Sequence, residues 1–283
     1  MDFLLENEPT IRLSAFLSIF AAMALFEIML PRRRPEVLDG APVKGRRWFS
    51  HGSLVIIDSL VLRLVFPAAA VGTAHYASVS GIGLFNAYDI PLWLAALIAF
   101  IILDFAVWLE HWASHKIPLL WRIHRMHHAD TDFDVTTALR FHPLEIVLSM
   151  VWKAAIVIAL GAPVVAVLVF EIVLNGMAMF NHSNAKLPLW LDRIIRIVFV
   201  TPDMHRVHHS SDQPETDSNY GFNFSFWDRL FKTYTPEPAL GHEGMQIGLK
   251  NYRGKAPSTL TWNLTVPFKA LARPKSQKIS TGK

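Results

Sequence analysis

Four apolar stretches of this chain are long enough to lie in a lipid bilayer, and they constrain the fold more than any other feature. They cover residues 11–30, 54–74, 90–109 and 144–180. A bilayer core about 30 Å thick needs roughly 20 mostly apolar residues in each helix. The fourth stretch is broken by Gly161-Ala162-Pro163, which should end or kink a helix. It therefore forms either two short spans or one re-entrant hairpin. These patterns predict an all-α fold, a polytopic membrane bundle of about four to five embedded helices.

The charges between these stretches predict their orientation. Six basic residues separate the first two stretches, whereas residues 71–89 contain no Lys or Arg. Since cytoplasmic loops are enriched in Lys and Arg, the basic loop should be cytoplasmic and the N-terminus should face outward. Residues after Leu109 should then return to the cytoplasmic side and form a helical cap there. The basic residues of that loop are Arg32, Arg33, Arg34, Lys44, Arg46 and Arg47.

The composition removes several chemistries and points to another. Cysteine is absent, which excludes disulfides, thiolate-bound clusters and cysteine nucleophiles. Histidine, in contrast, occurs 13 times, and ten of these residues lie between His111 and His209. Charged residues make up only 18% of the chain, below the roughly one quarter of soluble domains. The low content of charged residues is not typical of a soluble protein, and the many histidines favour a binding site.

Eight histidines form three clusters with helical spacing. Residues three or four apart share one face of a helix, and neutral imidazole suits iron, copper, zinc or nickel. Eight imidazoles exceed what one ion with open positions can use, so two neighbouring ions are the simpler interpretation. The clusters are His111 and His115; His124, His127 and His128; and His205, His208 and His209.

Other residues are weaker candidates. His182 follows the apolar hairpin on the same membrane side and is a plausible ninth ligand. His142 could be a ligand or a supporting residue. Asp104 lies seven residues before His111 on the same helix face, where it could accept an imidazole N–H or simply be a buried carboxylate. Asp203, beside the last cluster, carries the same ambiguity. We expect His51, His75 and His242 not to be ligands, because they have no partner at ligand spacing.

The order of these clusters resembles that of the fatty acid hydroxylase / sterol desaturase superfamily of integral-membrane oxygenases. The strings "PLLWRIHRMHHADTDFDVTTALRFHPLE", "NHSN", "TPDMHRVHHSSD" and "NYGFNFSFWDRLFKTY" are similar to those of its bacterial members, over roughly residues 98–234. The resemblance implies a non-haem di-iron centre held by the eight clustered histidines and His182, with O2 as co-substrate and a membrane lipid as substrate. No haem-binding His-Pro-Gly-Gly motif is present, so electrons would come from a separate electron-transfer protein or reductase. It also implies residence in a bacterial inner membrane, with the histidines facing the cytoplasm.

This interpretation divides the chain into three parts. Residues 1–97 form an N-terminal transmembrane region, residues 98–234 the catalytic domain, and residues 235–283 a basic tail. Residues 250–283 carry eight Lys or Arg and no acidic residue, which favours contact with anionic headgroups. The aromatic run of Phe222, Phe224, Phe226 and Trp227 is expected to anchor the chain at the membrane interface, and substrate contact is the less favoured alternative.

The sequence leaves several functions open. A lipid hydroxylase is preferred, and a desaturase on the same scaffold would use the same oxidant. A metal transporter would place its ligands near the bilayer midplane on broken helices, whereas these clusters follow the third span. A zinc hydrolase needs only three ligands and one open position, so eight or nine histidines are too many. We expect no nucleic-acid partner.

Overall fold

The computed structural model describes residues 2–34, 37–38, 41–42, 44–88 and 90–270. Within these residues, five helical segments are long and apolar enough to cross a membrane, as the sequence predicted. The prediction of an all-α polytopic bundle is therefore confirmed; one pair of two-residue strands, β1 (Val37–Leu38) and β2 (Ala41–Pro42), is the sole sheet among the described residues. The five segments contain α1 (Asp2–Met29), α2 (Lys44–Val65) followed by the shorter α3 (Ala69–Val79), α5 (Leu92–Lys116), α7 (Pro143–Leu160) and α8 (Val164–Asn181).

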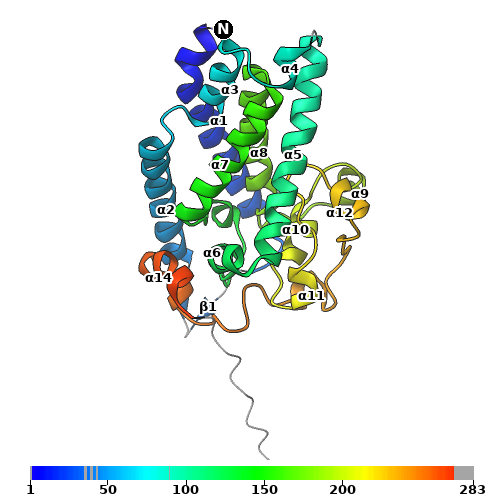
Figure 1. The fold of residues 1–283 in the computed structure, drawn as a ribbon. Helices are drawn as coiled ribbons and strands as arrows, with labels where there is room; N and C mark the ends of the chain where they lie inside the picture. The colour runs from blue at the N-terminus through cyan, green and yellow to red at the C-terminus, as the bar shows by residue number, and fades with distance from the viewer. Residues whose placement is uncertain (1, 35–36, 39–40, 43, 89, 271–283) are drawn as a thin grey trace, which may run out of the picture.

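The bundle is built around α5, α7 and α8 (Figure 1). α5 packs against α7 and α8, while α8 also contacts α1 and α3, and α7 also contacts α2 and α3. The apolar cluster at the centre contains Leu103 from α5, Val157 from α7 and Phe170 from α8, each at most 1% exposed. The outer faces of the helices are apolar and exposed instead; Leu64 of α2 and Trp93 of α5 are 83% and 69% exposed. A soluble monomer rarely exposes so much apolar surface, whereas a bilayer solvates it.

The second apolar stretch differs from the single span predicted over residues 54–74. The helix is interrupted after Val65, and α3 begins at Ala69. Pro67 explains the break, because proline lacks the N–H of a helix interior and disfavours the helical conformation at the residue before it. Ala69 also has a positive φ of 47°. The prediction was wrong about continuity, and α2 and α3 are two helices set end to end.

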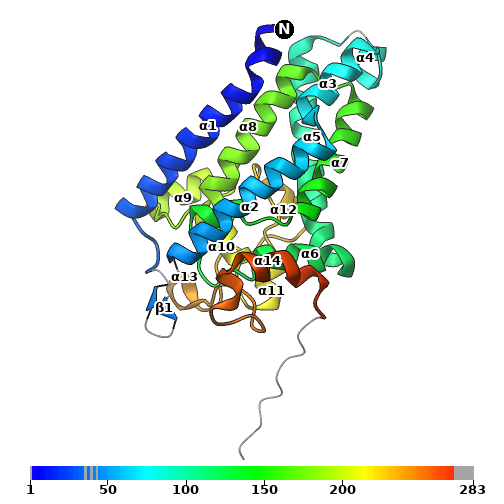
Figure 2. The same ribbon diagram turned by 90° about the vertical axis from the view of Figure 1, so that its left-hand side faces the viewer.

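The fourth stretch folds as two helices, with the break at Gly161-Ala162-Pro163 as predicted. Gly161 ends α7 in the left-handed conformation, with a φ of 64°. A Cβ atom on Gly161 would lie 2.6 Å from the side chain of Asn86 in α4 (Leu84–Ala87) and 2.8 Å from the carbonyl oxygen of Ile82, so glycine is required on steric as well as conformational grounds. α7 and α8 are thereby antiparallel: α7 leads away from the end of the bundle where α1 and α5 finish, and α8 returns to it (Figure 2).

The short helices that follow α5 gather toward that end in both views, whereas α4 lies at the other end (Figures 1 and 2). They include the segments between α8 and residue 270, so the described part of the predicted basic tail is folded rather than extended. Arg125 donates to the carbonyl oxygens of Val266 and Lys269 at 2.7 and 2.6 Å, which fixes this segment against α6. Residues 271–283 lie outside the described residues. The short elements are α6 (Pro118–His128), η1 (Val135–Leu139), α9 (Leu189–Ile195), α10 (Pro202–His208), α11 (Gln213–Thr216), α12 (Phe226–Leu230), α13 (Gly241–Gly244), η2 (Ala256–Ser258), α14 (Leu260–Thr265) and η3 (Val266–Phe268).

The absence of cysteine allows a direct test of this arrangement. Ser80 caps α3 at one end of the bundle, and Lys255 precedes η2 near the other. If the bundle spans a membrane as its apolar faces indicate, Ser80→Cys and Lys255→Cys should be labelled by an impermeant maleimide from opposite sides of sealed vesicles. Labelling of both positions from one side would contradict the membrane arrangement.

Candidate metal centre

All nine histidines proposed as ligands lie together, in two groups of imidazoles. Within each group, the ring nitrogens that could bind an ion lie within 4.8 Å of one another. Eight of these residues are buried, and His115 is intermediate. The first group is His111, His115, His124, His128 and His208, and the second is His127, His182, His205 and His209.

The two groups do not follow the sequence clusters, because helical geometry divides each His-x2-His-His cluster between them. With 3.6 residues per turn, residue i+4 lies about 40° from residue i, and residue i+3 lies about 60° away on the other side. In α6, His124 and His128 therefore contribute to the first group, while His127 contributes to the second. In α10 and its cap, His205 and His209 join the second group and His208 joins the first.

Backbone carbonyls determine which ring nitrogen of several histidines carries the proton. His111 Nδ1 lies 2.7 Å from the carbonyl oxygen of Tyr220, and His208 Nδ1 lies 2.6 Å from that of Ser218. A carbonyl oxygen only accepts hydrogen bonds, so each Nδ1 must donate, and in a neutral imidazole the Nε2 atom is then an acceptor.

Two histidines of the second group are held in the same way. His127 Nδ1 donates to the carbonyl of Arg140 at 3.1 Å, and His182 Nδ1 donates to that of Ala178 at 2.7 Å.

These assignments leave acceptor atoms facing each other inside both groups. The Nε2 atoms of His111 and His208 are 3.0 Å apart, and those of His127 and His182 are 3.1 Å apart. Neither pair has a proton to share unless an imidazole becomes charged. Burial opposes that charge: it lowers the pKa of His208 to about 3 and that of His182 to about 4.

A metal cation would satisfy both pairs. Two facing lone pairs in a buried site repel each other, whereas a cation bound by both nitrogens replaces repulsion with coordination. In the first group, the Nε2 atoms of His115 and His124 each lie 3.1 Å from that of His128. In the second, those of His205 and His209 lie 3.0 and 3.2 Å from His182 Nε2. The donor set of each group therefore fits one ion bound by several imidazoles.

The three weaker candidates, Asp104, His142 and Asp203, belong to neither histidine group. Asp104 accepts from the indole N–H of Trp227 at 2.8 Å, so it anchors the segment after α11 rather than an imidazole. His142 caps α7 by accepting from Leu144 N at 3.1 Å. Asp203 pairs with Arg206, and Arg32 lies 3.2 Å away. These residues are candidates in the sequence only because they share a helix face with a cluster or lie near one, and neither property shows which groups a side chain binds.

Glu145 is a residue of the site that the sequence analysis missed. Its Oε1 atom accepts from His124 Nδ1 at 2.6 Å, which orients that imidazole as a carboxylate commonly does for a metal-binding histidine. Glu145 is in the first turn of α7, 21 residues after His124. No helical spacing links two residues on different helices, so no pattern could have identified the pair.

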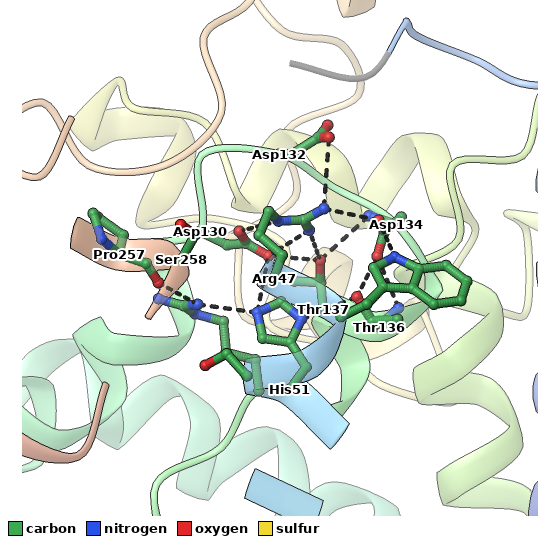
Figure 3. A network of polar contacts seen from close by, with 12 residues as sticks. Arg47, His51, Asp130, Asp132, Asp134, Thr136, Thr137, Pro257 and Ser258 are labelled. Atoms are coloured by element: carbon green, nitrogen blue, oxygen red, sulfur yellow. Dashed lines mark hydrogen bonds and ion pairs between the residues drawn. The ribbon is translucent and has the colours of Figure 1, made fainter. Parts of the chain in front are cut away.

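A buried ion network supports the loop between α6 and α7 (Figure 3). Arg47 donates to both carboxylate oxygens of Asp130 at 2.7 Å and to Asp134 at 2.8 Å. Burial acts to raise the pKa of Asp130, but pairing with Arg47 outweighs burial and holds that pKa below its ordinary value. Arg47, which the charge pattern of the sequence assigns to a loop, is wholly buried in α2 in the structure.

Arg140 connects this network to the second histidine group. Its side chain donates to His51 Nε2 at 3.0 Å and to the Pro257 carbonyl at 2.8 Å, while its own carbonyl accepts from His127. His51, which we expected not to be a ligand, lies in neither group and donates from Nδ1 to Thr136 at 2.9 Å. The network thus fixes the backbone that orients His127.

The network predicts a large difference between two adjacent arginines. Arg47→Ala would leave the carboxylates of Asp130 and Asp134 buried without their main partner, and should lower the free energy of unfolding by about 3–5 kcal/mol. Arg46 is exposed, so Arg46→Ala should change it by less than about 0.5 kcal/mol. Thermal unfolding in detergent would compare the two variants with the wild type. Equal stability of both variants would contradict the assigned role of Arg47.

Comparisons with known proteins show that this chain is similar in sequence to several lipid hydroxylases and monooxygenases. An ornithine lipid hydroxylase from Rhizobium tropici is 27% identical over 266 residues, covering 91% of this chain and 76% of that protein. Human alkylglycerol monooxygenase is 30% identical over 140 residues, which span 49% of this chain and 30% of the human protein. A cholesterol 25-hydroxylase-like protein from Danio rerio is 24% identical over 233 residues, 78% of this chain and 87% of the fish protein. No solved structure matches the chain significantly.

The family comparison covers the segment that holds the histidines. Residues 96–233 match the family model for fatty acid hydroxylase. This range runs from within α5 to just beyond α12 and contains all nine histidines of the two groups and Glu145. The matched segment, residues 96–233, therefore belongs to the fatty acid hydroxylase family.

Proposed function

We propose that this protein is an O2-dependent, di-iron hydroxylase of a membrane lipid. The observation that carries the proposal is the pair of adjacent imidazole groups, each with acceptor nitrogens facing across about 3 Å. The fatty acid hydroxylase match and the lipid hydroxylases among the relatives support an oxidoreductase acting on lipid. Nine histidines as ligands and two ions are our inferences from the donor set, and the use of O2 is our inference from the similarity to the fatty acid hydroxylase family.

Iron is the ion that best fits the reaction and the ligands together. Imidazole binds zinc, copper, nickel and iron, but zinc has no redox chemistry. When bound, two iron ions would supply the redox capacity to reduce O2 and oxidise an unactivated C–H bond. We infer that electrons would come from a separate electron-transfer protein or reductase.

The chain's own residues orient the ligands and exclude water. The carbonyls of Tyr220, Ser218 and Arg140 hold imidazole N–H groups, so the corresponding Nε2 atoms remain available as ligands. Aromatic rings cover the groups; Trp121 lies 4.9 Å from His115 and Phe141 lies 4.6 Å from His127, measured between ring centroids. A dry site protects a reactive oxidant from side reactions with water.

The position of the site suits a lipid substrate. The histidines lie at the end of a bundle whose outer faces are apolar, so a hydrocarbon chain can approach from the membrane and a soluble donor from the opposite side. The basic residues between α1 and α2 lie at this same end, which favours the cytoplasmic side and an outward N-terminus. We infer an integral protein of a bacterial inner membrane, with residues 98–234 as its catalytic domain between a transmembrane region (1–97) and a basic C-terminal part (235–283).

The reaction can be tested by following oxygen into the product. Purified protein with a chemical or enzymatic reductant, membrane lipid extract and 18O2 should yield a lipid that is heavier by one 18O atom, detected by mass spectrometry. A new double bond without 18O would instead identify a desaturase on the same scaffold. No oxidised lipid under these conditions, in protein shown to hold two iron ions, would contradict the proposal.

The two groups should lose metal separately. His208→Ala removes a ligand of the first group and His205→Ala a ligand of the second, so each variant should hold about one iron per chain where the wild type holds about two. His142→Asn is a matched control, because His142 belongs to neither group and asparagine preserves a side-chain acceptor for the helix cap.

Elemental analysis of protein purified in detergent gives the iron count directly. Loss of both ions in either variant would show that the two groups form one cooperative site. A wild-type protein with a single ion would exclude the two-ion arrangement.

A further inference from the structure

We propose that Phe222 is the specificity-determining residue at which the hydrocarbon chain of the substrate meets the metal centre. This inference rests on the proposed function and extends it, by identifying where the lipid enters and what limits its depth. The sequence analysis placed Phe222 in an aromatic run expected to anchor the chain at the membrane interface. The structure places its ring against the imidazoles instead.

The ring of Phe222 contacts both histidine groups. Its centroid lies 5.1 Å from the ring of His111 in the first group and 6.0 Å from that of His205 in the second. Phe222 thus lies against one imidazole of each group, so a substrate that approached the two groups along this side would meet its ring. The size of the side chain at position 222 then decides how closely a carbon atom of the substrate can approach the two imidazole groups.

The same ring also belongs to the apolar interior of the bundle. Phe222 packs against the central apolar cluster, which includes Leu103 of α5 and Phe170 of α8. It packs as well against a second cluster around Val135 and Met179, which joins η1 and α8 to α1. Phe222 is therefore continuous with the apolar surfaces that a hydrocarbon chain would follow between the helices.

Other aromatic residues on the imidazoles do not make this connection. Phe133 lies 5.1 Å from His209 and 5.7 Å from His182, but it packs with Met245 and Ile247, near the short helices after α12. Among the described residues, Phe222 is the aromatic contact of the histidines that belongs to the two clusters of the membrane helices.

The cavity between α5, α6 and α7 is a less suitable route. It has a volume of about 340 Å³ and is lined mainly by apolar side chains such as Leu120 and Trp152. None of its lining residues is a histidine of either group; Glu145 lines it and accepts from Nδ1 of His124. A chain bound in this cavity would remain outside the imidazole shell.

The backbone around Phe222 is fixed, so its ring is the movable part. The carbonyl oxygen of Phe222 accepts from the buried side chain of Asn181 at 2.6 Å. Gly221 donates to Asp228 at 2.9 Å, and the carbonyl of Asn223 accepts from Val200 at 3.0 Å. Substrate entry therefore needs rotation of one aromatic side chain rather than displacement of a loop.

The first experiment tests lipid contact without requiring catalysis. The photoreactive residue p-benzoylphenylalanine is placed at position 222, 133 or 93 in cells whose acyl lipids carry an alkyne tag. Irradiated protein should carry tagged lipid at positions 222 and 93, the latter because Trp93 is 69% exposed on the bundle surface, and not at position 133. Labelling at position 93 with none at position 222, in protein that retains its iron, would overturn the proposal.

The second experiment uses the products. If the wild type incorporates 18O into a lipid, Phe222→Ala and Phe222→Leu should shift the hydroxyl group to other carbons, with an unchanged iron count. Phe224→Ala is the matched control: Phe224 lies two residues away and stacks on Phe199 and Phe226, with no imidazole contact, so it should keep the wild-type position.

The two experiments separate the failure of this inference from that of the proposed function. An active wild type whose Phe222 variants give the wild-type product at the wild-type position would refute the role of Phe222 and leave the hydroxylase assignment intact. A wild type that inserts no oxygen would refute the assignment, while the crosslinking result would still decide whether lipid reaches position 222.

Discussion

The site depends on imidazoles that are buried, neutral and held with their Nε2 atoms converging. Each Nδ1–H that donates to a carbonyl commits one ring nitrogen, and the other then faces its neighbours as an acceptor. Facing acceptors at 3.0–3.1 Å are unfavourable in a buried site unless a cation lies between them. The surrounding structure supports this arrangement, because the accepting carbonyls belong to segments far apart in the chain, from Arg140 to Tyr220.

Much of this site could be predicted from the sequence, because helical spacing is a local property. The clusters around His111, His124 and His205 identified eight of the nine residues, and the return of the apolar hairpin identified His182. Their division between two groups follows from the same helical geometry, since i+3 and i+4 lie on different sides of residue i. The allocation nevertheless needed the structure, because it depends on how α5, α6 and α10 are oriented toward one another.

The supporting residues could not be predicted, since they act across long separations in the sequence. Asp104 shares a helix face with His111 but binds Trp227, 123 residues later. Glu145 orients His124 from a different helix. In the sequence, Arg47 resembles the other basic loop residues, but in the structure its buried side chain pairs with Asp130 and Asp134. Pro67 is a local signal for a helix break, but the apolar composition of residues 54–74 led to the prediction of one continuous span.

The central claim, that two metal ions lie within the two imidazole groups, is tested most directly by anomalous X-ray scattering at the iron edge from crystals of the purified protein. The account predicts two separate iron peaks, one among His111, His115, His124, His128 and His208 and the other among His127, His182, His205 and His209. A single peak, or iron bound outside these groups while the imidazoles face each other without an ion, would contradict it.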